Sequence, residues 1–253
     1  PEPMSFYVRR GQVPPKRHTQ FRRPERALYT EEVLGEEGIH GIGSNSYHIH
    51  PPTQVYGWKT LYSTKAEYVE TDVMRMRHLE SHSMKPEGDP VTGRKVLLGN
   101  ADCELAICVP EAGTTDYHYK NGQGDECLFI NYGSGTVYTM FGTLRFRRKA
   151  YIVLPKGTIY RVEFDALPES ERPENKAGEK ADIPFGKFLV IETTNASHIA
   201  PPPGYLSKKT SQFLEHAPYC ERDLRLPELP LTFDETGEFE VRVKARDCMH
   251  SYT

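Results

Sequence analysis

A pair of histidines near the N-terminus has a spacing that could serve metal chemistry. His48 and His50 form a local His-x-His pair. On a β-strand alternate side chains share a face, so both imidazoles would point to the same side. However, Pro51 and Pro52 end such a strand at once, and no acidic residue lies at the distance of a metal motif. We interpret this pair as structural.

A second pair, His78 and His82, lies four residues apart. That spacing would place both imidazoles on one face of a helix. The surrounding apolar residues fit an irregular strand equally well, and we therefore expect a solvated pair rather than a site.

The cysteines are the other soft ligands of the sequence. Their number is odd, five in a chain of 253 residues, which predicts free thiols in a reducing compartment. Cys103 and Cys108 lack a second pair at a zinc-like spacing, so we interpret them as small buried hydrophobic residues. The five positions are Cys103, Cys108, Cys127, Cys220 and Cys248.

A β-rich segment from Tyr117 to Phe164 is the element that would position side chains around a site. Short runs of apolar, β-branched and aromatic residues alternate there with glycine- and proline-containing turns. The runs cover residues 127–130, 136–141, 143–147, 151–154 and 158–164. Short antiparallel strands at this density predict an all-β sandwich or small barrel.

The chain divides into three predicted parts. Residues 1–46 are a basic, proline-punctuated arm that ends in a glycine-rich loop over residues 31–46. Residues 47–199 form the β-barrel. Residues 200–253 begin with a proline-rich linker and contain an alternating strand at residues 239–245, whose partner we expect beyond the end of the chain.

Composition excludes several classes of function. The formal net charge is -3, so no overall field favours nucleic acid or an anionic membrane as a partner. No apolar run approaches the length of a membrane span, and residues 1–10 lack the apolar core of a signal peptide. These features predict a cytoplasmic protein.

The spacing within the β-rich segment resembles the cupin family. Cupin barrels carry a glycine, a His-x-His pair, a glutamate and a glycine, followed downstream by Pro-x-Gly and a histidine. In this chain Glu126 precedes Gly133, and Pro155-Lys156-Gly157 stands at a strand hinge. The resemblance implies a cupin-type antiparallel β-sandwich or barrel.

The same resemblance identifies three residues that would point into the barrel, His118, Glu126 and Tyr160. Lys120 stands at the second imidazole position, and Tyr160 stands where the last histidine is expected. Because Fe(II) is held by two imidazoles and a carboxylate, the metal triad is not intact. We predict no metal ligand and no catalytic residue in this segment. The three residues then form either a remnant substrate pocket or a polar core cluster, with Glu126 paired to Lys120 or a nearby arginine. We favour the cluster, since a buried charge needs a partner.

Longer motifs narrow the resemblance to homogentisate 1,2-dioxygenase, particularly the N-terminal half of its short bacterial form. They extend over nearly the whole chain. The motifs are Pro14 to Arg22, Tyr47 to Pro52, Gly99 to Ile107, Tyr117 to Asp125, Tyr138 to Gly142, Leu154 to Gly157 and Gln212 to Asp223.

This resemblance implies an activity for the complete protein. It would open the ring of homogentisate with O2 to give maleylacetoacetate, in tyrosine and phenylalanine breakdown. Fe(II) would be held by residues outside this segment, in a C-terminal cupin domain, and the 253 residues alone would be inactive. The family implies a homo-oligomer, a trimer or hexamer, whose partners are a small aromatic acid and O2.

Two alternatives stay open. The chain could be a stand-alone, metal-free cupin that serves as a small-ligand binding or oligomerisation module. It could also belong to a related dioxygenase with a different aromatic acid as substrate, because the N-terminal half hardly distinguishes the two.

Overall fold

The structure is a computed structural model that describes residues 22–35, 43–48, 51, 54–69, 76–174, 177–194, 198–199, 225–228 and 237–253. The chain forms two compact units. The hairpin unit comprises residues 1–55 and 200–236, and the barrel unit comprises residues 56–199 and 237–253.

The described part of the hairpin unit contains strands β1 (Thr30–Gly35) and β2 (Gly43–His48), which pair in antiparallel register. The loop predicted over residues 31–46 is therefore wrong at both ends. Residues 31–34 alternate between half-buried and exposed positions, as they do on a strand with one wet face. Gly35 and Gly43 stand at the ends of the two strands, and the other glycines of the predicted loop lie outside the described residues.

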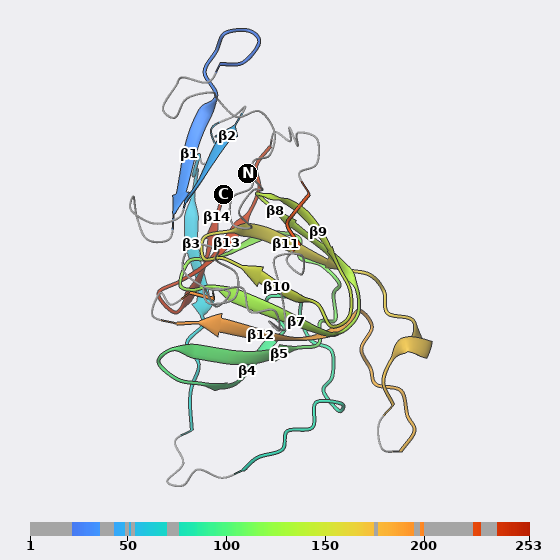
Figure 1. Ribbon diagram of the computed structural model, residues 1–253. Coiled ribbons are helices and arrows are strands. Elements are labelled where there is room, and N and C mark those ends of the chain that lie inside the picture. The colour runs from blue at the N-terminus through green and yellow to red at the C-terminus, as the bar shows by residue number, and fades with distance from the viewer. Residues whose placement is uncertain are drawn as a thin grey trace, which may run out of the picture. The chain divides into compact units, whose positions relative to one another are not determined.

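The barrel unit consists of two sheets (Figure 1). The five-stranded sheet has the order β10 (Tyr151–Leu154), β7 (Glu126–Tyr132), β12 (Lys187–Thr193), β5 (Cys103–Cys108) and β4 (Arg94–Gly99). The seven-stranded sheet has the order β3 (Trp58–Ser63), β14 (Cys248–Tyr252), β13 (Val241–Ala245), β6 (His118–Asn121), β11 (Ile159–Phe164), β8 (Gly135–Thr139) and β9 (Gly142–Phe146). A short 3-10 helix, η2, spans Glu169–Glu171.

The connections between the sheets define a jelly roll. From β5 to β12 the chain passes repeatedly from one sheet to the other, with β8 and β9 as the one hairpin that stays within a sheet. This double-sheet arrangement is the architecture of cupins. The predicted all-β, cupin-type sandwich is confirmed.

Alternation along the strands builds the core between the sheets. On β10, Ile152 and Leu154 are buried, whereas Tyr151 and Val153 are exposed. Phe188 and Val190 of β12 are buried in the same way and pack in one cluster with Phe164 of β11. Each such side chain stabilises the fold by about 1.5–3 kcal/mol through burial.

The C-terminal strands return to the barrel. The partner of strand 239–245 was expected beyond the end of the chain, and this prediction is wrong: β13 pairs in parallel with β6 and antiparallel with β14. Arg246 and Asp247 form the two-residue turn between β13 and β14, with φ values of 51° and 55°. Such turns usually carry Asn-Gly or Asp-Gly, so this hairpin has no strong sequence signal.

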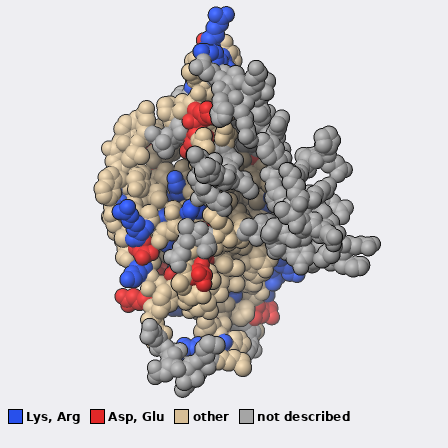
Figure 2. Space-filling model, turned by 60° about the vertical axis from the view of Figure 1, so that its left-hand side comes forward, with Lys and Arg blue, Asp and Glu red and all other residues tan. Residues whose placement is uncertain are grey.

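On the face drawn in Figure 2, basic and acidic side chains lie next to one another, and neither sign forms a continuous patch among the described residues. No helix in the described part of the chain has the length and apolarity that crossing a membrane requires.

Candidate functional site

Glu126 is the centre of a polar cluster buried between the two sheets. Its side chain is 1% exposed. Oε1 accepts hydrogen bonds from Arg94 Nη1 at 2.7 Å, from the Tyr119 hydroxyl at 3.1 Å and from Asn121 Nδ2 at 3.1 Å. Oε2 accepts a hydrogen bond from the Tyr160 hydroxyl. We call these five residues the Glu126 cluster.

Strand alternation brings the cluster together. On β6, Tyr119 and Asn121 are buried, and Tyr119 lies directly opposite Tyr160 of β11. The two rings meet edge to face with centroids 5.4 Å apart. Arg94 begins β4, where its Nε donates to the Pro90 carbonyl at 2.9 Å, and its Nη2 donates to the Tyr160 hydroxyl at 3.0 Å.

The electrostatics of the cluster favour an ionised glutamate. Burial by itself raises the pKa of Glu126, but the charge of Arg94 and hydrogen bonds from Tyr160 and Asn121 outweigh it and hold this pKa below its usual value. Burial and the Glu126 carboxylate raise the pKa of Tyr119 well above that of a free phenol. Burial raises the pKa of Tyr160 likewise. Both phenols therefore act as neutral donors to a carboxylate whose charge is balanced by Arg94.

These residues do not fit a ferrous ion. Four donors already occupy the Glu126 carboxylate, and none of them is an imidazole. Arginine has no lone pair to offer a metal and remains protonated in proteins. Among the described residues, no three His, Cys, Asp or Glu side chains gather in a way that could hold a metal ion.

The structure corrects one of the three predicted pocket residues. Glu126 and Tyr160 meet as predicted, but His118 lies on the opposite face of β6 from Tyr119, where its ring meets Phe239 edge-on with centroids 6.1 Å apart. Lys120 shares the face of His118 and is not a partner of Glu126. The cupin alignment assigned the inward-facing positions to His118 and Lys120, whereas Tyr119 and Asn121 are the residues of β6 that face inward. A shift of one residue along a strand exchanges its two faces.

The structure describes three of the four histidines in the two pairs singled out in the sequence. His48 Nε2 lies 2.9 Å from Glu32 Oε2, across the β1–β2 hairpin, whereas His50 lies outside the described residues. His78 and His82 are both exposed, as predicted for a solvated pair.

The thiol prediction is confirmed for four of the cysteines. Cys103, Cys108, Cys127 and Cys248 are free thiols. Cys220 lies outside the described residues, as does the motif from Gln212 to Asp223.

A row of three glutamates crosses the five-stranded sheet. Glu192 of β12 lies directly opposite Glu104 of β5 on one side and Glu126 of β7 on the other. Lys244 Nζ from β13 is 2.6 Å from Glu192 Oε1 and 3.8 Å from Glu104 Oε2. Burial and the neighbouring Glu126 charge raise the pKa of Glu192, against the opposing effects of Lys244 and a hydrogen bond from Asn121.

Sequence reasoning expected Glu126 to pair with Lys120 or a nearby arginine, but it did not identify Arg94 as that arginine, and it missed Lys244. Arg94 is 32 positions from Glu126, and Lys244 is 52 positions from Glu192. The available signal was the carboxylates themselves. Both glutamates stand beside apolar strand residues, and a buried carboxylate requires a cation or several donors.

No protein-family model matches this sequence. The chain is 29% identical over 244 residues to a protein of Saccharolobus solfataricus named "Putative dioxygenase". The match covers 95% of this chain and 56% of the relative, so the chain spans about half of the length of that protein.

Solved structures with a similar arrangement include a cupin protein from Bacteroides fragilis, with 12% identity and a TM-score of 0.33 over 53% of this chain and 93% of that chain. A protein with a double-stranded β-helix domain from Klebsiella pneumoniae has 13% identity and a TM-score of 0.34 over 49% and 95% of the two chains. The strand order of the two sheets carries the fold assignment. The chain thus has a cupin-type fold and is similar in sequence to a protein named as a dioxygenase.

Proposed function

We propose that the chain is the N-terminal, non-catalytic cupin part of a ring-opening dioxygenase of the homogentisate 1,2-dioxygenase type. In this proposal the complete protein converts homogentisate and O2 to maleylacetoacetate. Fe(II) and its ligands lie outside the 253 residues, so the segment alone is inactive.

The proposal rests on two observations together, the extent of the match to a longer protein and the residues in the centre of the barrel. Almost the whole chain aligns with about half of a longer protein named as a dioxygenase. The centre of its jelly roll, meanwhile, holds an arginine–glutamate pair with two tyrosines instead of a set of metal ligands. A barrel with this interior supports structure and assembly, and redox chemistry then requires a further part of the protein.

The remaining features follow as parts of the same proposal. The substrate is a small aromatic acid, and the protein works as a homo-oligomer, a trimer or hexamer. The residues of this segment contribute subunit contacts and scaffold rather than bonds to the reacting atoms.

The experiment compares the full-length protein encoded by the gene with the segment 1–253. Iron is measured by mass spectrometry of the metal content, and O2 uptake is followed with homogentisate. We expect about one iron per full-length chain, as a single facial site requires, and none in the segment. 2,5-Dihydroxybenzoate, which lacks the side-chain methylene, tests the choice of aromatic acid.

A conservative variant tests the role given to the barrel. Tyr160→Phe in the full-length protein removes one donor to Glu126 and keeps the ring, so iron content and turnover should stay within about twofold of the wild type. Iron bound stoichiometrically by the segment, or iron lost on Tyr160→Phe from a protein that still folds, would contradict the proposal.

A second candidate function has its own observation. A cavity at one end of the barrel unit favours a small-ligand binding module, which could act with or without a dioxygenase partner domain. An encoded protein that contains no iron and does not consume O2 with either aromatic acid would favour this reading.

A further inference from the structure

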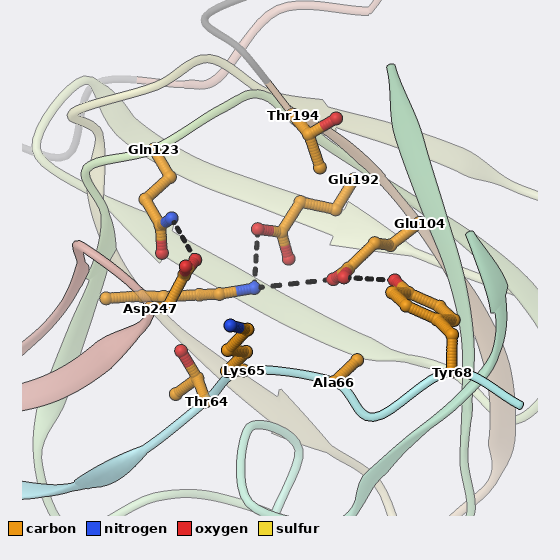
Figure 3. Close-up of a pocket in the computed structure, with 10 residues that line it drawn as sticks. Thr64, Lys65, Ala66, Tyr68, Glu104, Gln123, Glu192, Thr194 and Asp247 are labelled. Carbon is orange, nitrogen blue, oxygen red and sulfur yellow. Dashed lines mark hydrogen bonds and ion pairs between the residues drawn. The ribbon is translucent and has the colours of Figure 1, made fainter. Parts of the chain in front are cut away.

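A polar cavity lies at one end of the barrel unit, and we call it the mouth pocket (Figure 3). Its volume is about 380 Å³. Small-molecule sites usually measure about 300–1,000 Å³. Its walls come from β5, β12, β13, the turn after β6, the β13–β14 turn and residues 64–68. All of these belong to the barrel unit.

The lining holds three carboxylates, including that of Asp247, and two ammonium groups, so ion pairing leaves only a small negative charge for a ligand to neutralise. Lys244 already bridges Glu192 and Glu104. The Tyr68 hydroxyl donates to Glu104 Oε1 at 2.5 Å, and Lys65 adds a second ammonium to the lining. A strongly anionic ligand would meet carboxylates, and a strongly cationic one would compete with a lysine that is already in place.

Two oxygen atoms of the lining lack hydrogen-bond partners. Thr64 Oγ1 and Gln123 Oε1 are both shielded from solvent, and neither has a partner among the described residues. The Gln123 amide cannot simply be turned, because its Nε2 donates to Asp247 Oδ1 at 2.9 Å and a carboxylate only accepts. Buried polar atoms are almost always satisfied, so both oxygens call for an explanation, and an oxygen closed to solvent can meet a ligand only if its side chain turns.

The Thr64 hydroxyl can be turned without moving the backbone. The Thr64 amide is fixed by a hydrogen bond to the Asp247 carbonyl at 2.7 Å. Rotation about the Cα–Cβ bond is the remaining freedom, and threonine has alternative staggered rotamers. Figure 3 shows Thr64 and Lys65 across the cavity from Glu192 and Thr194, with Gln123 and Asp247 at one side and Glu104 and Tyr68 at the other.

We propose that the mouth pocket binds an uncharged, polyhydroxylated molecule, a polyol or a monosaccharide. Neighbouring hydroxyl groups donate to carboxylate oxygens and accept from lysine and threonine at the same time, as this mixed lining requires. The tyrosine ring at the side of the pocket offers an apolar surface to the carbon skeleton. The proposal stands on the barrel unit alone and does not depend on dioxygenase activity.

The test titrates the full-length protein with four probes by saturation-transfer NMR. Xylitol and myo-inositol are the uncharged polyols, and acetate and methylammonium are the charged controls. We expect saturable binding of at least one polyol and no comparable binding of either ion. A protein that binds neither polyol, or that prefers an ion, overturns the proposal.

Two variants locate the binding. Thr64→Val should weaken polyol binding by about three- to tenfold through loss of one hydrogen bond. The unliganded protein should be equally or more stable, since the valine removes a buried hydroxyl that has no partner. Lys65→Ala should weaken binding by a similar factor, and it keeps the test valid if Thr64→Val does not fold.

Lys85→Ala is the matched control, because Lys85 is an exposed lysine that does not line the pocket. Its binding constant should match that of the wild type. Equal affinity in the wild type, Thr64→Val and Lys65→Ala would place the polyol elsewhere and refute the assignment.

Discussion

Replacing Arg94 with methionine tests the central physical claim about the barrel interior. Methionine keeps most of the length and apolar volume of the arginine stem, so packing changes little. What disappears is the guanidinium, which donates to Glu126 and Tyr160 and is the cation of the Glu126 cluster. The variant therefore leaves a carboxylate buried without its counter-charge.

The expected cost is large because both partners are buried. The side chains of Arg94 and Glu126 are 11% and 1% exposed. Breaking such a pair from one side typically destabilises a protein by about 3–5 kcal/mol. A domain has about 5–15 kcal/mol of stability in total, so Arg94→Met should come close to unfolding a barrel of low stability.

The loss should also depend on pH. Burial is the largest single influence on the pKa of Glu126 and acts to raise it, so without the Arg94 charge we expect this pKa to lie above the unfolded value. A carboxyl whose pKa rises on folding contributes stability that is present at low pH and lost as the pH increases. The difference in the free energy of unfolding between the wild type and Arg94→Met should therefore be greatest near neutral pH. It should shrink toward about pH 4, where the carboxyl of the unfolded chain titrates.

The assay is urea unfolding followed by circular dichroism at several pH values. Lys95→Met is the matched control on the same strand, because Lys95 pairs with Glu87 at 2.6 Å with side chains 48% and 66% exposed. An exposed pair contributes less than about 1 kcal/mol. The double variant Arg94→Met/Glu126→Gln should recover part of the loss. The reasoning is refuted if Arg94→Met costs no more than Lys95→Met, or if its cost does not change with pH.

Three further predictions concern other groups. Since the folded pKa of Glu192 is raised, its contribution to stability is lost as the pH rises through that pKa, and Glu192→Gln should gain stability relative to the wild type with increasing pH in urea titrations. A gain that is constant with pH would contradict this. Burial raises the pKa of the Cys108 thiol to about 12, so native protein treated with iodoacetamide should be modified at Cys103 before Cys108, as read by peptide mass spectrometry. Arg246→Gly should raise the free energy of unfolding by about 0.5–1 kcal/mol, because glycine adopts the φ of 51° without strain; an unchanged melting temperature would argue against strain in that turn.

The sequence determined the fold class and the strand content of the barrel. Apolar runs separated by glycine and proline turns, such as residues 127–130 and 151–154, became β7 and β10. A period-2 pattern and turn residues act over a few positions, so they can be read from the chain directly. The sequence also placed Glu126 and Tyr160 in the interior, and it required a cation beside the glutamate.

Only the tertiary structure decided which cation that is and which side chains surround it. Arg94 and Lys244 reach their carboxylates from strands far away in the sequence, and the β13–β14 hairpin that carries Lys244 has a turn without a glycine signal. The tertiary structure also decided which face of β6 points inward, because a shift of one residue exchanges His118 for Tyr119 in the interior. Local patterns specify strands, whereas register and long-range ion pairs are set by packing the two sheets together. That packing brings Arg94 to Glu126 in a hydrogen-bonded core where a cupin would hold metal ligands.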